Sequence, residues 1–241
     1  WTLRHYAEIL QDQYVQSALL QTLAFCGATA AVATLLSLPA SWWIAKARPG
    51  HSTLRLLCQV NYAFGGVVYG MLMVTLLGNA GVMTMLEKML FGASGGQGYA
   101  YTVVGLTVAY LGFQTPRAAL LMAQAIERIV PQLVRAATVL GATPRQTLLM
   151  VLTPLLSRSL ALTYLATALI SLASFGTALL IAKSLDIFAV LIFREFTGYG
   201  ELHRAAAMGV VLAACCLVLD VLARRVGTSA APLTATLGAK N

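Results

Sequence analysis

The sequence predicts an all-helical protein that crosses a membrane several times, and three observations carry this prediction. Hydrophobic residues make up 59% of the 241 residues and charged residues only 10%, whereas soluble domains carry about a quarter charged residues. The mean hydropathy is +0.79. Long apolar stretches recur along the chain, and a membrane span needs roughly 20 mostly apolar residues. We therefore expect a polytopic membrane helical bundle of about five spans.

The expected spans form one domain, residues 1–227, which is followed by a polar tail of small residues, 228–241. A further apolar segment, 185–196, is about a dozen residues long and has charged residues at both ends. Because it is too short to cross a membrane, we expect a re-entrant or interfacial segment there. The five spans are predicted at residues 19–44, 54–77, 101–125, 160–182 and 205–223.

The net charge of +8 indicates how the chain is oriented. Loops that follow odd-numbered spans are basic, whereas the other loops are balanced or acidic. By the positive-inside rule the basic loops and the C-terminus face the cytoplasm, which predicts a multi-pass membrane protein with a cytoplasmic C-terminus. Nucleic acid is not an expected partner, because the basic residues form no continuous stripe. The basic residues concerned are Lys46, Arg48, Arg55, Arg128, Arg135, Arg145, Arg224 and Arg225.

The loop between the third and fourth spans has helix-ending and helix-capping residues at distinctive positions. The polar segment 126–131 is expected to end the membrane helix, and 133–140 is expected to form a short helix. Gly141 permits a left-handed turn at the end of that helix, Thr143 is placed to cap the next helix, and Pro144 suits its first position. The sequence therefore predicts two short helices hinged at Gly141.

This loop resembles the cytoplasmic docking loop of ABC importer permeases, whose pattern is Glu-Ala-Ala, three residues, Gly, nine residues, Ile-x-Leu-Pro. Here the chain reads Arg-Ala-Ala, three residues, Gly, nine residues, Val-Leu-Thr-Pro. The Ala-Ala, Gly and Pro positions match in identity and spacing, at Ala136, Ala137, Gly141 and Pro154. Arg135, Val151 and Thr153 depart from the pattern.

Two further segments resemble the same family. The first span ends Ser-Leu-Pro-Ala at 37–40 and Ala-Lys-Ala-Arg at 45–48, and the segments 193–201 and 222–225 are similar to the last part of these permeases. The resemblance runs from about residue 16 to residue 225. It is to type I binding-protein-dependent importers, in the group that includes thiamine, ferric iron, sulfate or molybdate, and polyamine permeases. The second span lacks a Pro-Pro pair common in the oxyanion members, which disfavours sulfate and molybdate.

The resemblance implies a set of partners. Two permease copies, or this chain and a paralogue, would form the solute path, and a periplasmic solute-binding protein would deliver the substrate. ABC ATPase subunits would hold ATP and Mg and would bind the docking loop. The loop residues concerned are Arg135, Ala136, Ala137, Gly141, Ala142, Thr143, Pro144 and Pro154.

The chain itself carries no pattern for catalysis, for a cofactor or for a metal. The segment 94–97 reads Ser-Gly-Gly-Gln, as in the signature motif of ABC ATPases, but the sequence has no GxxxxGK[ST] phosphate loop. A GxSxG elbow and an HExxH helix are also missing, and the four cysteines fall within apolar spans. We therefore expect a non-enzymatic subunit whose ATP hydrolysis takes place in a partner.

Polar residues inside the spans are candidates for the solute path. Arg117 stands beside Pro116 in the middle of the third span, where an uncompensated charge costs a few kcal/mol or more and usually faces a cavity or a partner. Its alternative roles are a structural ion pair or a side chain that reaches the interface. Ser174 occupies a place where relatives carry a short segment with an acid that lines the path. Weaker candidates are Gln59, Asn61 and Gln114, whose alternative is hydrogen bonding between helices.

Two functions from other classes stay open. A secondary transporter driven by an ion gradient predicts an inverted repeat and acidic residues near the membrane midplane, and the sequence shows neither. A noncatalytic membrane scaffold is compatible with the composition, but it gives no reason for the spacing between Gly141 and Pro154.

Overall fold

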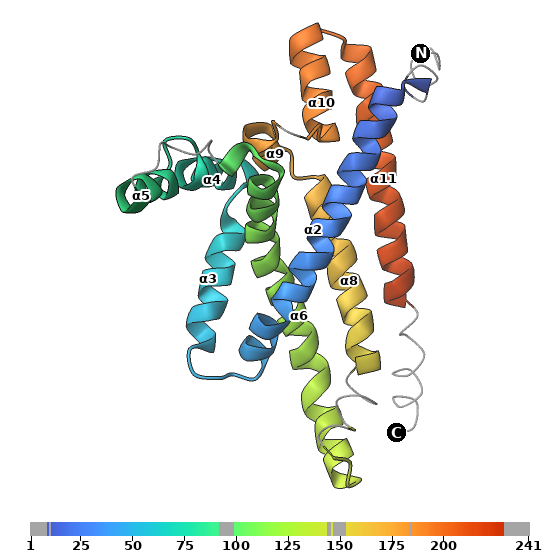
Figure 1. Cartoon of the computed structure of the whole chain (residues 1–241). Coiled ribbons are helices and arrows are strands. Elements are labelled where there is room, and N and C mark those ends of the chain that lie inside the picture. The colour runs from blue at the N-terminus through green and yellow to red at the C-terminus, as the bar shows by residue number, and fades with distance from the viewer. Residues whose placement is uncertain are drawn as a thin grey trace.

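The computed structural model describes residues 9, 11–91, 99–143, 146, 153–183 and 185–228. Every regular element in these residues is a helix, so the predicted all-helical bundle is confirmed. Four long helices form its body (Figure 1). They are α2 (Gln13–Ala45), α6 (Val103–Val139), α8 (Thr153–Leu172) and α11 (Leu202–Thr228).

Helix α2 lies against both α6 and α8 at the centre of the bundle (Figure 1). It begins at Asp12, whose Oδ1 accepts the backbone N–H of Tyr14 at 3.0 Å. Its buried face carries small side chains, among them Ala33 and Ser37, which are both 0% exposed. Small residues allow helix backbones to approach closely, which is how helices pack where the surrounding lipid is as apolar as they are.

The predicted second span is not one helix. It is divided into α3 (His51–Ala63) and α4 (Gly66–Leu77), because Phe64 and Gly65 adopt extended backbone angles. Two consecutive glycines at this point each cost a helix about 1 kcal/mol relative to alanine, so the break falls where the helix is weakest. Helix α5 (Val82–Phe91) follows, and α4 and α5 extend to one side of the bundle (Figure 1).

The predicted fourth span is also interrupted. Helix α9 (Phe175–Ile181) follows α8 after a bend of 56°. The segment predicted to be re-entrant or interfacial forms a short helix, α10 (Phe188–Arg194), and a five-residue π turn, η3 (Glu195–Tyr199). Phe188 is fully buried, and its backbone N–H donates to Thr22 Oγ1 on α2 at 2.8 Å. The short helix is therefore fixed to the bundle.

The described helices include three or four candidate membrane spans, where the sequence predicted about five, and are consistent with the predicted membrane bundle. By length and composition, three described helical stretches could cross a membrane: Gln13–Ala45, Gly66–Met89 and Leu202–Gly227. The bent pair of α8 and α9 would make a fourth. Two of the predicted spans failed as single helices because the apolar pattern continues through each break, whereas the backbone does not.

Helix α6 corrects a second expectation. The polar segment 126–131 does not end the membrane helix, and residues 133–139 continue α6 without interruption through Pro131. A proline removes one backbone donor and can kink a helix without ending it. The polar Glu127 pairs with Arg55 on α3, so that charge is balanced while the helix continues.

Helices α4 and α9 pack closely through glycines. A Cβ atom at Gly176 would lie 2.5 Å from Val67 Cγ2 and 2.7 Å from Val67 N. At Gly70 an added Cβ would lie 3.2 Å from Thr177 Cα. The pattern of two glycines, Gly66 and Gly70, separated by three residues thus brings the two backbones together, as its spacing predicts.

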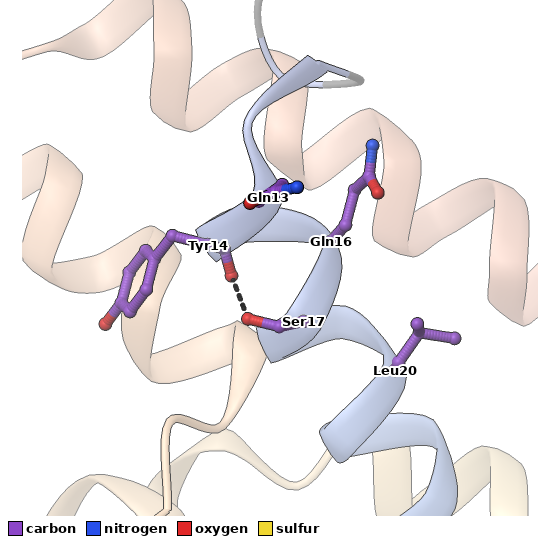
Figure 2. A pocket seen from close by; sticks show the side chains of 5 residues that line it. All are labelled: Gln13, Tyr14, Gln16, Ser17 and Leu20. Atoms are coloured by element: carbon purple, nitrogen blue, oxygen red, sulfur yellow. Dashed lines mark hydrogen bonds between the residues drawn. The ribbon is translucent and has the colours of Figure 1, made fainter.

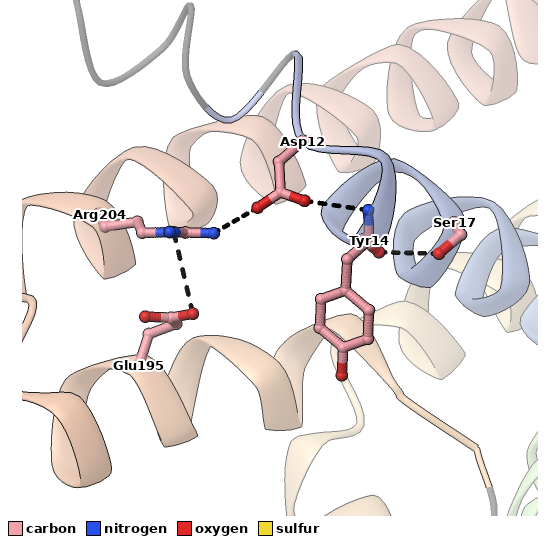
Figure 3. A network of polar contacts seen from close by, with 5 residues as sticks. All are labelled: Asp12, Tyr14, Ser17, Glu195 and Arg204. Atoms are coloured by element: carbon pink, nitrogen blue, oxygen red, sulfur yellow. Dashed lines mark hydrogen bonds and ion pairs between the residues drawn. The ribbon is translucent and has the colours of Figure 1, made fainter.

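The two ends of the bundle differ in charge. The end where α2, α6 and α11 terminate and α3 and α8 begin, here called the basic end, carries Lys46, Arg48 and Arg55 among its residues (Figure 1). At the opposite end, Arg204 on α11 contacts Asp12 at 2.6 Å and Glu195 at 3.8 Å (Figure 3). This network joins the start of α2 to η3 and α11. A shallow hollow on the first turns of α2 lies beside it, lined by Gln13, Tyr14, Gln16, Ser17 and Leu20 (Figure 2).

Candidate translocation junction and docking loop

One stripe of α6 faces both helix breaks. Tyr110, Phe113, Gln114 and Arg117 are spaced at i, i+3, i+4 and i+7, so they lie on one side of the helix. Arg117 is 14 residues from the start of α6 at Val103, which is about 21 Å along the helix. We call the place where this stripe, the α3–α4 break and the α8–α9 break meet the junction.

Arg117 contacts the end of α3. Its Nη2 donates to the carbonyl oxygen of Tyr62 at 3.3 Å, which is a backbone acceptor that the break leaves near the end of the helix. The guanidinium lies 4.8 Å from the centre of the Tyr62 ring and 5.6 Å from that of Phe113. Cation–π contacts of this kind stabilise by about 0.5–2 kcal/mol.

The charge of Arg117 has no acidic partner within the described residues. Its Nε is buried and has no hydrogen-bond partner there. The ion-pair alternative is therefore not supported by the described residues, and the contacts to Tyr62 and Phe113 take its place. A buried donor left without an acceptor costs about 1–3 kcal/mol, and more for a charged group.

The second break adjoins the first. The Tyr110 hydroxyl donates to the carbonyl oxygen of Ser174 at 3.2 Å, where α8 has ended. Thr177 Oγ1 on α9 donates to the carbonyl oxygen of Gly66 at 2.9 Å, in the first turn of α4. A Cβ atom at Gly66 would lie 3.6 Å from Ser174 Oγ. Irregular backbone inside a membrane is tolerated where protein buries it or where it lines a cavity, and these bonds join the two breaks to each other and to α6.

Gln114 is as fully buried in the junction as Tyr110 and Thr177. It is 0% exposed, and its Nε2 donates to Ser171 Oγ at 2.9 Å and to Thr29 Oγ1 at 3.5 Å. These bonds join α6 to α8 and to α2, which agrees with the alternative that span amides connect helices. Its Oε1 is buried without a hydrogen-bond partner among the described atoms.

The remaining path candidates, Asn61 and Gln59, lie in different surroundings. Asn61 is half-buried near the α3–α4 break, its side chain lies at the Tyr69 hydroxyl, and its Oδ1 has no hydrogen-bond partner in the part of the chain that is described. Gln59 is exposed on α3 and contacts nothing at the junction that the described residues show. Sequence reasoning missed Tyr110 and Thr177, although Tyr110 lies seven residues, or two turns, before Arg117.

The docking loop begins with the end of α6. Gly141 has a φ of +77°, in the left-handed region, as its place after the helix predicts. The N–H of Ala142 donates to the carbonyl of Ala137 at 3.0 Å, and that of Leu140 donates to the carbonyl of Ala136 at 3.1 Å. An added Cβ at Gly141 would meet no atom within 4 Å, so glycine is needed here for its backbone conformation and not for space.

Thr143 and Gln146 form a reciprocal cap. Thr143 Oγ1 accepts the N–H of Gln146 at 3.4 Å, and Gln146 Oε1 accepts the N–H of Thr143 at 2.9 Å. This is a capping box, which begins a helix at its Ser or Thr. The predicted role of Thr143 as a cap is thus confirmed.

The structure describes the other predicted loop residues in part. Pro144 of the loop lies outside the described residues. The Ser-Gly-Gly-Gln segment 94–97, which precedes the third span and is not part of the loop, also lies outside them. Arg135 falls within α6 and Pro154 within α8. Ala136, Gly141 and Thr143 are exposed, Ala142 is half-buried and Ala137 is buried. The described part of the loop therefore presents small and polar groups, together with the exposed apolar side chains of Val139 and Leu140, around an exposed left-handed turn.

Comparison with known proteins gives matches among solved structures, but none among family models or curated proteins. A chain in the crystal structure of a bacterial alginate ABC transporter, in complex with an alginate pentasaccharide-bound periplasmic protein, matches with a TM-score of 0.73 at 18% identity. The match covers 93% of this chain and 82% of that one.

A second crystal structure, of a bacterial ABC transporter involved in the import of the acidic polysaccharide alginate, gives a TM-score of 0.72 at 17% identity. It covers 96% of this chain and 85% of the other. Identity at this level shows a shared fold. The chain accordingly shares its fold with the matched chains of these alginate ABC transporter structures.

Proposed function

We propose that this chain is a permease subunit of a binding-protein-dependent ABC importer in the bacterial inner membrane. The observation that carries the proposal is the shared permease fold over 93% of the chain, in which the connection between α6 and α8 holds an exposed glycine turn followed by a capping box. The fold neighbour was solved with a periplasmic protein bound. By analogy, a solute-binding protein and ABC ATPase subunits are the partners of this chain.

The docking loop would receive the motion of the ATPase. The turn at Gly141 places exposed backbone and small side chains at the surface, where a neighbouring subunit can approach closely. Because α6 is one helix from Val103 to Val139, a displacement at its docking end is carried along the helix to the junction. The partner subunit would bind ATP and Mg. This chain would contribute helix α6, which transmits the displacement, and the solute path.

The junction would be the moving part of the path. Discontinuous membrane helices commonly form the binding sites of transporters, because freed backbone groups and half-helix ends face the solute. Here two breaks meet beside Arg117, whose Nε is not bound within the described chain. We place the solute path along Arg117, Asn61 and Ser174, with Gln114 as the contact that holds the surrounding helices.

The substrate is best sought through the binding protein. The alginate of the fold neighbours belongs to those proteins, and the loop resemblance extends to importers of thiamine, ferric iron and polyamines. A second copy of this chain, or a paralogue, would complete the path. Mass spectrometry of ligands retained by the copurified binding protein would name the substrate without a prior guess.

The decisive experiment is affinity purification of this chain from its native host in mild detergent, with a known ABC complex purified in parallel. Stoichiometric recovery of an ABC ATPase is the expected result. If the chain is recovered alone or only with itself while the reference complex stays intact, the proposal is wrong. The ion-gradient transporter or the scaffold then becomes the better interpretation.

A further inference from the structure

A groove between α6, α8 and α11 lies near the basic end of the bundle. Its volume is about 380 Å³, and it is open to the surroundings of the bundle. Leu121 on α6 and Leu162 and Ala166 on α8 give it apolar walls, and Ala223 closes it on α11. Arg128 and Ser159 supply polar groups. The groove lies further along α6 than the junction, on the same face of the helix, because Leu121 follows Arg117 by about one turn.

The charged end of the groove lies toward the basic end of the bundle. Helix α6 runs toward the basic end, so Arg128 lies about 10 Å further in that direction than Leu121. Helix α8 runs the opposite way, and Ser159 lies about 10 Å nearer the basic end than Ala166. The groove therefore has Arg128 and Ser159 at one end and Leu121 and Ala166 at the other, with the polar side chains of Gln124 and Thr163 between them.

A bilayer with one face of its hydrocarbon layer at the start of α6 would have the headgroups of its other face near Arg128. From Val103, where α6 begins, to Arg128 is 25 residues, or about 38 Å of helix. The hydrocarbon layer of a bilayer is about 30 Å thick. A helix that enters this layer near its first residues has left it by Arg128, whereas Leu121 is still at the depth of the acyl chains.

The charge of Arg128 is available to a ligand. Arg128 is exposed and forms no ion pair within the described residues. Nearby basic residues are engaged: Arg224 pairs with Asp220 at 2.7 Å, and Arg158 donates to the carbonyl of Gly227 at the end of α11. The acid beside Arg128, Glu127, is bound to Arg55 on α3.

We propose that this groove binds an anionic glycerophospholipid. One acyl chain would lie along Leu121, Leu162 and Ala166, and the phosphate would contact Arg128, with Ser159 as a further hydrogen-bond donor. Basic pockets between membrane helices at the cytoplasmic side attract anionic headgroups. A soluble anion would use the charge alone and would leave the apolar walls unexplained. The proposal does not depend on the chain being an importer subunit.

The test is native mass spectrometry of the full chain, with the subunits that copurify, titrated with phosphatidylglycerol and with phosphatidylcholine. The wild type is expected to retain phosphatidylglycerol in preference. Arg128→Gln should weaken its retention about fivefold, which corresponds to about 1 kcal/mol, the attraction of one arginine to an anionic membrane surface. Arg128→Lys keeps the charge and should retain most of the binding.

Two further variants make the test specific. Arg48→Gln removes a charge from the same end outside the groove, where Arg48 lies over the Trp43 ring, and should leave lipid retention unchanged. Ala166→Phe keeps Arg128 but fills the apolar wall, and it should weaken retention of phosphatidylglycerol. Equal losses from Arg48→Gln and Arg128→Gln would show a general attraction of charge, and no loss from Ala166→Phe would exclude the acyl-chain site. Either result overturns the proposal.

Discussion

Arg117 is held by aromatic faces and by one carbonyl, and this distinguishes it from an ordinary ion-paired arginine. A lysine at this position would keep the charge but would lose the planar group that stacks on Tyr62 and donates to its carbonyl. We expect Arg117→Met to reduce substrate uptake at least tenfold and Arg117→Lys to reduce it partly. Initial uptake rates in membrane vesicles measure both.

The control for this prediction is assembly. Copurification of the partner subunits with Arg117→Met at the wild-type level would show that the fold is intact. If uptake is then unchanged in both rate and affinity, Arg117 is an anchor between α3 and α6 and has no part in the path.

Gly176 sets the distance between α4 and α9. Its replacement by alanine brings a Cβ within 2.7 Å of a backbone nitrogen, which cannot move away as a flexible side chain can. Overpacking of this kind costs about 1–3 kcal/mol. We expect Gly176→Ala to lower the thermal unfolding temperature in detergent.

The matched variant is Gly209→Ala on α11, where an added Cβ meets nothing within 4 Å. Removing a glycine from a helix interior favours the helix by about 1 kcal/mol, so this variant should be neutral or stabilising. Equal destabilisation by the two variants would show that the close approach of α4 and α9 is not what makes Gly176 necessary.

At the scale of elements, apolar length predicts where helices lie but not where they break. Residues 54–77 and 160–182 read as continuous spans, and the structure interrupts both. The Phe64–Gly65 break lies beside a donor far along the chain, since the Thr177 hydroxyl donates to the Gly66 carbonyl across 111 residues. Conversely, the polar segment 126–131 suggested a break that α6 does not have. Local composition carries no information on such distant partners.

Short sequence patterns predicted those features that depend on contacts between residues close in the sequence. The left-handed Gly141 and the cap at Thr143 rest on bonds between residues three to five positions apart, and both were predictable. The same holds for the pair of Asp220 and Arg224, four residues apart on α11. Arg117 could be singled out by its charge in a span, whereas its contact to Tyr62 could not, because that contact requires the α3–α4 break.

The left-handed turn at Gly141 is the part of the docking loop that we expect coupling to the ATPase to require. Valine is strained at a φ of +77°, by about 1–2 kcal/mol, whereas asparagine tolerates the left-handed region. We expect Gly141→Val to abolish stimulation of the partner ATPase and ATP-driven uptake, and Gly141→Asn to retain most of both. ATPase activity of the reconstituted complex measures the difference.

Membrane levels of the Gly141 variants serve as the control, because the turn lies outside the apolar spans. Since an added Cβ meets nothing there, the chain should still insert and fold. Full ATPase stimulation by Gly141→Val would separate this turn from coupling.

At the scale of the whole molecule, the asymmetry of charge predicts the orientation. Glu201 immediately precedes α11 and Arg225 lies in its last turn, 24 residues or about 36 Å away. We expect a cysteine in place of Glu201 to react with a membrane-impermeant maleimide in spheroplasts. A cysteine in place of Arg225 should react only after lysis, because the positive-inside rule places it in the cytoplasm.

The labelling needs a background in which Cys26, Cys58, Cys215 and Cys216 are replaced by alanine. Uptake by that background is the control for an intact fold. The reverse labelling pattern would place the Gly141 turn outside the cell, where no ATPase subunit can reach it.

The contact between α4 and α9 also has a consequence for biosynthesis. The acceptor at Gly66 leaves the ribosome 111 residues before its donor, Thr177. At about 5–20 residues per second, that interval lasts about 5–20 s. During it, the face of α4 that later packs against α9 has other neighbours, such as lipid, water or the insertion machinery. Synthesis of the second half of the chain therefore covers a helix face that the first half carries into the bilayer uncovered.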